Sequence, residues 1–398
     1  MPKSVLTKGL LRRFLDGEAT LAMVEDCYRQ REPEIQAFCE WAPQPSTGTG
    51  LLAGVPVAVK DIFDVAGMRT EWGSKIFAGR TASGDAGVVR MFRERGAVML
   101  GKTHTTSFAY FDAAPTRNPR DLAHSPGGSS SGSAAAVAVG MAPVAIGSQT
   151  QGSVLRPASY CGVVGLKPSF GILPLDGTMA FAPSLDTAGL FTQTAEDMRL
   201  LWSRLGFATG GSSRIRMAAL PIPEEVEGPM RAAFWQAREA LDAHWVHPPD
   251  SLADLHLTVK LIQDYEGART HQETFEKHGE AVGAKLAEMI RRGLATPDAQ
   301  YHAAKEKLVS AKGDMARLLV NYDVLLTPAA LGPPPRDLTY TGDPRMNAPW
   351  TGLGLPAISI PMHVEEGLPL GLQMVAGPRG EALLLDAACQ AEACILEG

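Results

Sequence analysis

The sequence predicts a mixed α/β fold, because short apolar segments typical of β-strands alternate with helical segments along its whole length. A chain of 398 residues could contain two or three domains, but the unbroken alternation favours a single domain over residues 1–398. No repeat with a period of about 20 to 50 residues is visible, which disfavours a solenoid. Apolar residues make up 45% of the chain and charged residues 20%, a composition that disfavours disorder, a collagen-like repeat and a coiled coil.

The N-terminal segment, about residues 1–45, is predicted to be helical. Leucine and phenylalanine side chains recur at helical spacing between residues 3 and 18, and charged residues interrupt them, whereas a signal peptide has an uncharged apolar centre. Residues 42–50 are rich in Pro, Gly, Ser and Thr and are predicted to form a loop. After this loop we expect a buried strand at 51–59, a helix at 86–95 and a short strand at 97–100.

The segment 125–177 has the most unusual composition in the chain, because Gly, Ser and Ala dominate it. A flexible linker would be polar throughout, but apolar runs at 134–139 and 141–146 predict a buried helix followed by a buried strand. Small residues at this density therefore indicate backbones that pack closely around a site.

The remainder of the chain is predicted to return from helices to strands. Helices are expected at 196–205 and within a helical region at about 224–320, whose charge-rich part carries His271, His278 and His302, expected in water. The expected C-terminal elements are strands at 324–326, 357–360 and 371–375 and a closing helix from Glu381.

Charge and cysteine content exclude several classes of protein. The formal charge of −6 does not suit a dedicated nucleic-acid binder. The five cysteines lack CxxC spacing, so we expect neither a disulfide framework nor a zinc site, and no metal or other cofactor. No apolar run reaches the roughly 18 residues of a membrane span. A cytoplasmic protein with a small-molecule substrate, and with neither nucleic acid nor membrane as partner, fits these features.

A first candidate motif is the segment Gly96–Thr103, which satisfies the P-loop pattern G-x-x-x-x-G-K-[ST] and would indicate an NTP-binding protein. The residues between its glycines, 97–100, have the apolar character of a strand. A phosphate-binding loop needs a turn at this point, so the match is weak.

A second candidate is Gly128–Gly132, which fits the G-x-S-x-G nucleophile elbow with Ser130 at its centre. An α/β-hydrolase needs a later acid and histidine, and His363 is the only late histidine in a strand-rich context. No apolar strand leads into Gly128, which argues against this motif.

A third pattern combines Lys60 at the end of a buried strand with Ser129 and Ser153 in two loops of small residues. Amide hydrolysis needs a nucleophile, a base and donors for an oxyanion. A buried lysine can be the base if burial keeps it neutral. The pattern resembles the amidase signature family, and further motifs at 161–168, 354–361 and 367–373 extend the resemblance from about residue 51 to the end.

This resemblance implies an amidase signature fold, with a mixed central β-sheet flanked by helices and a signature core at about 51–190. It also implies an amidase that releases acid and ammonia: Ser153 attacks, Ser129 passes the proton and Lys60 accepts it, with a cis peptide bond before Ser129. The oxyanion hole would consist of the backbone amides of Thr150, Gln151, Gly152 and Ser153.

Three residues depart from the common family pattern. Gln149 stands where members commonly have Asp, and Gln151 where they commonly have Gly. Arg156 lies three residues after the nucleophile rather than two, a register similar to that of the malonamidase branch. That resemblance implies that Arg156 binds the carboxylate of a malonamate-like amide and that the protein is a homodimer. Arg156 could instead brace the loop, and an ammonia-supplying subunit of a transamidosome is the alternative function.

Overall fold

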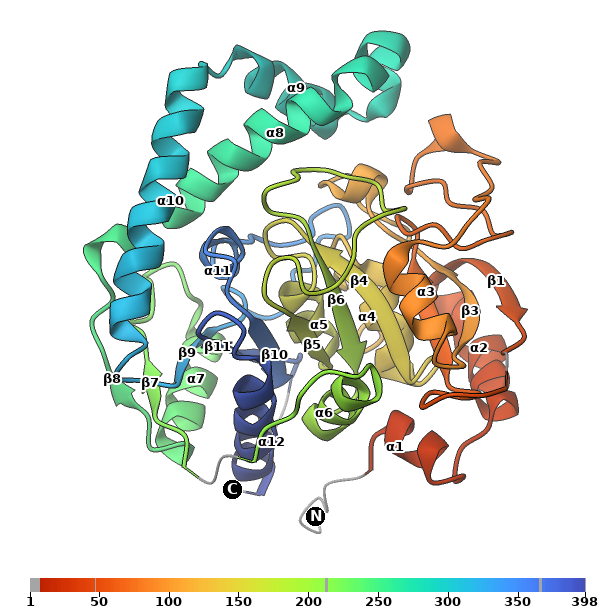
Figure 1. Ribbon diagram of the computed structural model, residues 1–398, viewed down its shortest axis with the longest axis horizontal. Helices are drawn as coiled ribbons and strands as arrows, with labels where there is room; N and C mark the ends of the chain where they lie inside the picture. Colours follow the sequence, from red (N-terminus) through yellow and green to blue (C-terminus); the bar gives the residue numbers. More distant parts are fainter. Residues whose placement is uncertain (1–7, 47, 212–213, 365–366, 398) are drawn as a thin grey trace.

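The computed structural model describes residues 8–46, 48–211, 214–364 and 367–397, and its strands form one large mixed sheet flanked by helices (Figure 1). The predicted α/β fold is confirmed. Across the sheet the strand order is β1-β3-β2-β4-β6-β5-β10-β11-β9-β7-β8. The bounds are β1 Phe38–Gln44, β2 Pro56–Lys60, β3 Val98–Thr103, β4 Val144–Gln149, β5 Val164–Lys167, β6 Thr187–Thr192, β7 Met217–Ala219, β8 His244–Trp245, β9 Val324–Pro328, β10 Ala357–Pro361 and β11 Gly371–Ala376.

Parallel and antiparallel pairs both occur in this sheet. β2 runs parallel to its neighbours β3 and β4, and β7 runs parallel to β8 and β9. The strands between these groups, from β4 to β9, pair antiparallel. Because β2 and β4 are parallel, their carboxyl ends meet at one edge of the sheet, and the candidate lysine and the loop of small residues therefore leave from neighbouring positions.

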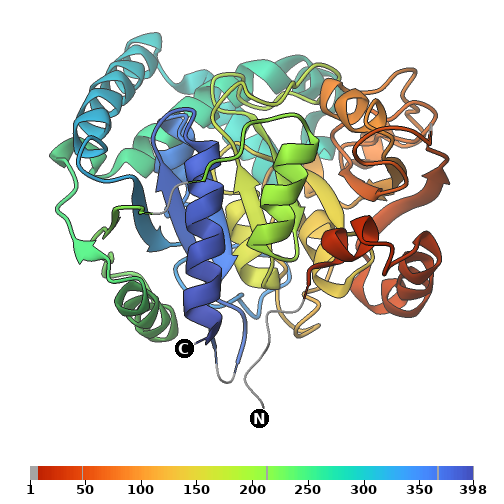
Figure 2. The same cartoon turned by 60° about the horizontal axis from the view of Figure 1, so that its bottom comes forward.

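The helices form layers on this sheet and a cluster beside it. α6 and α12 contact each other and lie side by side against the strands (Figure 2). A second pair, α4 and α5, packs on the central strands, while α8, α9 and α10 form a separate cluster. The α-helices are α1 Leu10–Leu15, α2 Leu21–Ile35, α3 Gly87–Arg93, α4 Ser131–Val139, α5 Leu155–Cys161, α6 Ala195–Arg204, α7 Gly228–Ala240, α8 Leu255–His278, α9 Ala284–Ala295, α10 Asp298–Leu318, α11 Ala348–Gly352 and α12 Glu381–Glu397.

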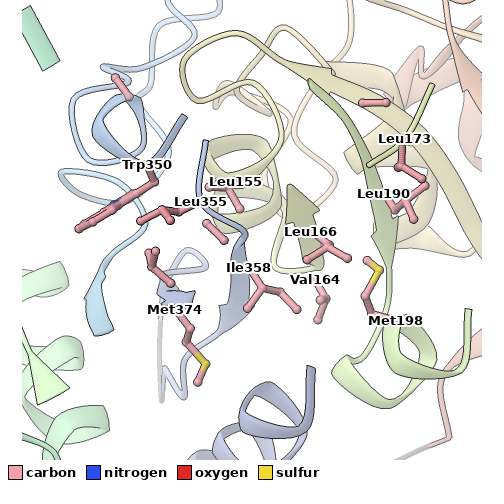
Figure 3. Close-up of a cluster of buried hydrophobic side chains, with 14 of the residues drawn as sticks. Leu155, Val164, Leu166, Leu173, Leu190, Met198, Trp350, Leu355, Ile358 and Met374 are labelled. Atoms are coloured by element: carbon pink, nitrogen blue, oxygen red, sulfur yellow. The ribbon is translucent and has the colours of Figure 1, made fainter. Parts of the chain in front are cut away.

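The core lies where α5 and α11 meet the sheet. Figure 3 shows Leu155 of α5, Leu166 of β5 and Ile358 of β10 in one apolar cluster, next to Trp350 of α11. Residues distant in sequence meet here, so the core holds the two ends of the site together.

The small residues of the signature segment allow close packing, as predicted. A Cβ at Gly147 of β4 would lie 2.6 Å from the Phe191 ring and 2.8 Å from Ser130 Oγ. A Cβ at Gly132 of α4 would collide with the backbone oxygen of Ala37. Glycine is therefore required at both positions for α4 to approach its neighbours.

Several predicted elements need correction. The N-terminal segment is not wholly helical, because residues 38–44 form β1 at the sheet edge; of the predicted helix at 3–18, the part before residue 8 lies outside the described residues. The alternation in Phe38–Gln44 is weak, since only Phe38 is fully buried. His271 is buried rather than in water, whereas His302 is exposed. A buried histidine on a charge-rich helix gives no periodic signal.

The P-loop interpretation of Gly96–Thr103 is wrong. Residues 98–103 form the fully buried strand β3, so the turn that would bind phosphate is absent. Lys102 Nζ lies 3.0 Å from Asp61 Oδ1 and 2.7 Å from Thr70 Oγ1. Its charge is thus already paired inside the protein.

None of the helices in the described chain combines the length and the apolar character that crossing a membrane requires.

Candidate active site

Lys60 is the last residue of β2 and is completely buried. Its Nζ lies 2.7 Å from Ser129 Oγ and 2.8 Å from Ser148 Oγ. Burial lowers the pKa of this amine well below its ordinary value, while the negative charge of Asp186 opposes the shift. Within the described chain, no carboxylate forms an ion pair with Lys60, so its surroundings favour the neutral amine.

Ser129 stands just before α4 and is almost completely buried. The Gly128–Ser129 peptide bond is cis, as the resemblance implies. The turn before it needs glycine, because Gly127 has φ +79° and a Cβ there would lie 2.9 Å from Pro157 Cα. Ser131 Oγ also donates to the Gly127 carbonyl at 2.7 Å.

Ser153 lies in the donor loop, residues 150–153, which joins β4 to α5. In contrast to Ser129, Ser153 is only partly buried. The four backbone amides of the donor loop make no hydrogen bond to another group of the described residues. Unpaired N–H groups are rare in protein interiors, so these amides are available to stabilise an oxyanion.

Asp186 is a neighbour of the site that the sequence analysis missed. It accepts hydrogen bonds from Thr150 Oγ1 at 2.6 Å and from the backbone amides of Phe181 and Ala182. Burial raises its pKa to about 6. Asp186 directly precedes β6, and neither periodicity nor motif spacing marks it in the sequence. Ser148 was missed for a different reason: it lies inside the motif at 147–158, where it resembles one more small residue.

Arg156, in the first turn of α5, is completely buried but has no hydrogen-bonded carboxylate. Its Nε donates to the Thr341 carbonyl at 2.6 Å and its Nη2 to the Gly128 carbonyl at 2.7 Å. Its Nη1 has no partner among the described residues. The arginine therefore braces the turn before Ser129 and also leaves one donor free.

The donor loop borders a cavity of about 290 Å³, whose lining includes Ser129, the donor loop and Arg156. A larger and mostly apolar cavity of about 660 Å³ adjoins it and shares Thr150 with it. Phe181 and Asp186 line this second cavity. The three residues of the proposed relay are thus brought to one place, with open space on the Ser153 side.

The nucleophile-elbow interpretation of Ser130 is wrong. Ser130 is completely buried, and its Oγ both donates to the Ser148 carbonyl at 3.2 Å and accepts from the Ser148 amide at 3.3 Å. His363, which this interpretation would need as the base, is exposed beyond the end of β10. A serine with both hydrogen-bonding functions used by the backbone is not available to attack a substrate.

The described residues contain no group of three or more His, Cys, Asp or Glu side chains that could hold a metal ion.

Comparison with known proteins gives a consistent result. A family model described as amidase matches residues 33–227 and 246–385. A subunit of the glutamyl-tRNA(Gln) amidotransferase of Symbiobacterium thermophilum is 31% identical, over 95% of this chain and 94% of that protein. The corresponding subunit of Methanosarcina mazei is 32% identical over 85% of this chain and 84% of its own.

Solved structures agree in fold. A chain from a vestigial protein complex, reported to reveal the evolutionary origins of an s-triazine catabolic enzyme, superposes with a TM-score of 0.86 at 26% identity, covering 97% of this chain and 96% of that one. The corresponding glutamyl-tRNA(Gln) amidotransferase subunit of Thermotoga maritima superposes with a TM-score of 0.80 at 28% identity, covering 93% and 90%.

Proposed function

Since this chain belongs to the amidase family and is an enzyme that cleaves amide C–N bonds, we propose that it hydrolyses a carboxamide to acid and ammonia through an acyl-enzyme on Ser153. The observation that carries the proposal is the buried Lys60 amine 2.7 Å from Ser129 Oγ, without a carboxylate partner among the described residues. Such an amine is a base that burial keeps unprotonated.

The proposed reaction begins with a proton relay. Ser129 passes its proton to the Lys60 lone pair and takes the proton of Ser153, whose oxygen attacks the amide carbonyl. A neutral amine has two N–H groups and one lone pair, so Lys60 can donate to Ser148 while it accepts from Ser129. The free amides of the donor loop stabilise the oxyanion.

The relay then runs in reverse to release the product. The proton returns from Lys60 through Ser129 to the leaving nitrogen, which departs as ammonia. Water, deprotonated by the same relay, attacks the acyl-enzyme and frees the acid. The proposed scheme needs no cofactor.

We propose that the substrate carries a carboxylate close to the reacting amide, as malonamate does. The support is Arg156, whose unpaired Nη1 belongs to a buried cation that lines the small cavity beside Ser153. A buried cation without an acid partner favours a negatively charged ligand. The contact to that ligand would use Nη1, because Nε and Nη2 already donate to backbone carbonyls.

The second candidate is an amidase subunit that takes ammonia from glutamine and supplies it to partner subunits. Relatives named as subunits of glutamyl-tRNA(Gln) amidotransferase, one of them aligned over 95% of this chain, favour it. Glutamine also carries a carboxylate, but farther from its amide than malonamate does. This candidate implies partner proteins, whereas the malonamidase resemblance implies a homodimer.

The deciding experiment is ammonia release from malonamate, glutamine and an uncharged amide such as propionamide. We expect malonamate to have the highest kcat/KM, and Arg156→Ala to lower that value by about 10- to 200-fold while changing propionamide hydrolysis less. Preference for glutamine would support the second candidate. Equal loss with all three amides would mean that Arg156 only braces the turn at Gly128.

A further inference from the structure

We propose that Thr351 and Gln149 are positioning residues that fix the direction of the Gly152 amide in the donor loop. This inference rests on the proposed function. Thr351 lies in α11, about 200 residues from the donor loop in sequence, and is almost completely buried. No sequence motif connects the two segments, and only the fold brings them together.

Thr351 makes two hydrogen bonds of defined direction. Its Oγ1 donates to the carbonyl oxygen of Gln151 at 2.8 Å and accepts from Nε2 of Gln149 at 3.0 Å. A hydroxyl has one proton, so the donor at Gln149 leaves that proton for the Gln151 carbonyl.

The orientation of the Gln149 amide is fixed by its other partners. Its Oε1 accepts from the backbone amides of Val154 and Leu155, at 2.9 and 3.1 Å. Both of these partners are donors, so the oxygen must face α5 and the nitrogen must face Thr351. Gln149 thus connects the first turn of α5 to α11.

These contacts determine where the Gly152 amide points. In a trans peptide the C=O and the next N–H point in opposite directions, so a Gln151 carbonyl held on Thr351 directs the Gly152 N–H away from α11. Gln151 and Gly152 line the cavity beside Ser153, and Thr351 does not. The Gly152 carbonyl is held in turn by the Arg156 amide at 3.0 Å, which orients the following N–H, that of Ser153.

This arrangement gives a physical meaning to glutamine at position 149. A carboxylate there could accept from the same two α5 amides, but it could not donate to Thr351. It would instead compete with the Gln151 carbonyl for the threonine proton. The donor loop of this chain therefore depends on an amide at 149 and a hydroxyl at 351 together.

The test compares Thr351→Val, which removes the hydroxyl at nearly constant shape, with Thr351→Ser, which keeps it, and with Gln149→Glu. We expect Thr351→Val and Gln149→Glu to lower kcat by about 10- to 100-fold with KM changed less than about threefold, because an oxyanion donor acts mainly in the transition state. Thr351→Ser should restore most of the activity. Thr270→Val, on the exposed surface of α8, is the matched control for loss of a threonine hydroxyl.

A second readout separates positioning from general loosening. A trifluoromethyl ketone analogue of the best amide substrate forms a tetrahedral oxyanion adduct, and Thr351→Val should weaken its binding by the same factor as kcat. The pKa of the acid limb of the pH profile should stay where it is in the wild type, since Lys60 does not contact Thr351. Circular dichroism measures the folded fraction, to which all rates are normalised.

Three outcomes would overturn the proposal: kcat of folded Thr351→Val within threefold of wild type, an unchanged affinity for the ketone, or a rise in KM without loss of kcat. A wild-type protein that hydrolyses no amide would overturn the proposed function as well. Active wild type with an equally active Thr351→Val protein would overturn only the positioning role.

Discussion

At the scale of single residues, three completely buried lysines show that burial alone does not make a base. Lys102 is paired with Asp61, and Lys167 donates to the carbonyls of Leu355 and Pro168. Carbonyls only accept, so Lys167 needs its protons for these bonds. Lys60 alone of the three contacts hydroxyl groups that can return a proton to it without also facing a carboxylate.

Replacing Ser153 with alanine should abolish turnover, by about ten-thousandfold or more, because the nucleophile and its relay fail as a unit. Labelling by a fluorophosphonate, followed by intact mass spectrometry, should disappear in the same variant. Ser130→Ala should still be labelled, since Ser130 Oγ is used by the backbone of Ser148. Labelling that survives Ser153→Ala would transfer the nucleophile to another residue.

Asp186 is expected to set the acidic limit of activity through its charge. Its carboxylate raises the pKa of Lys60, which must be neutral to act, so activity increases as pH rises through that pKa. Asp186→Asn removes the charge and should move the acid limb of kcat/KM to lower pH. The plateau rate should also fall, because Asp186 holds Thr150. A limb that moves to higher pH would contradict this assignment; the profile can be measured by ammonia release.

At the scale of elements, the donor loop between β4 and α5 requires glycine at 152. A Cβ there would collide with Asn347 Oδ1 and would lie 3.0 Å from Arg156 Nη1. The Asn347 oxygen cannot turn away easily, because its Nδ2 donates to the carbonyl of Ala329 and to Oε1 of Gln373. The loop is thus confined from the side opposite the cavity.

Gly152→Ala should therefore push the loop toward the cavity and lower kcat by about a hundredfold, in line with the effect of a 1 Å displacement at a catalytic group. The control is Gly84→Ala, where no heavy atom lies within 4 Å of the added Cβ. Kinetics together with circular dichroism would distinguish a displaced loop from unfolding. Full activity of a folded Gly152→Ala protein would show that the loop tolerates the Cβ.

At the scale of the whole molecule, His271 joins α8 to the signature core, where it packs on Phe108 and Phe181. Its Nε2 has no partner among the described residues, and burial lowers its pKa to about 4. The folded protein thus binds this proton less readily than the unfolded chain. The contribution of His271 to stability is complete above pH ~6.5 and is lost as the pH falls toward 4.

His271→Phe should remove this acid sensitivity at similar ring size. Relative to wild type, the unfolding free energy of the variant should become more favourable by about 2 kcal/mol between pH 7 and pH 4.5. Urea denaturation at both pH values measures the difference. The comparison between variants is needed because Asp186, Asp197 and Glu392, whose pKa values burial raises, shift stability in the opposite direction with pH. An equal pH dependence in both proteins would contradict the prediction.

Much of the fold and of the candidate site could be predicted from the chain alone. The buried strand ending at Lys60, the helix within 134–139 and the strand within 141–146 are where the apolar runs indicate. The edge strand β1 and the burial of His271 could not be predicted, because both depend on distant neighbours: β1 pairs with β3, and His271 meets Phe108.

By itself, the sequence determined the α/β class and the residues of the proposed relay, because apolar periodicity and motif spacing are local properties. Only the tertiary structure decided which polar groups meet. It shows that Lys102 is paired, that Ser130 is used by the backbone, that Arg156 keeps one free donor, and that Thr351 reaches the donor loop. Hydrogen bonds act over about 3 Å and are blind to separation along the chain, so these contacts exist only once the sheet has brought its strands together.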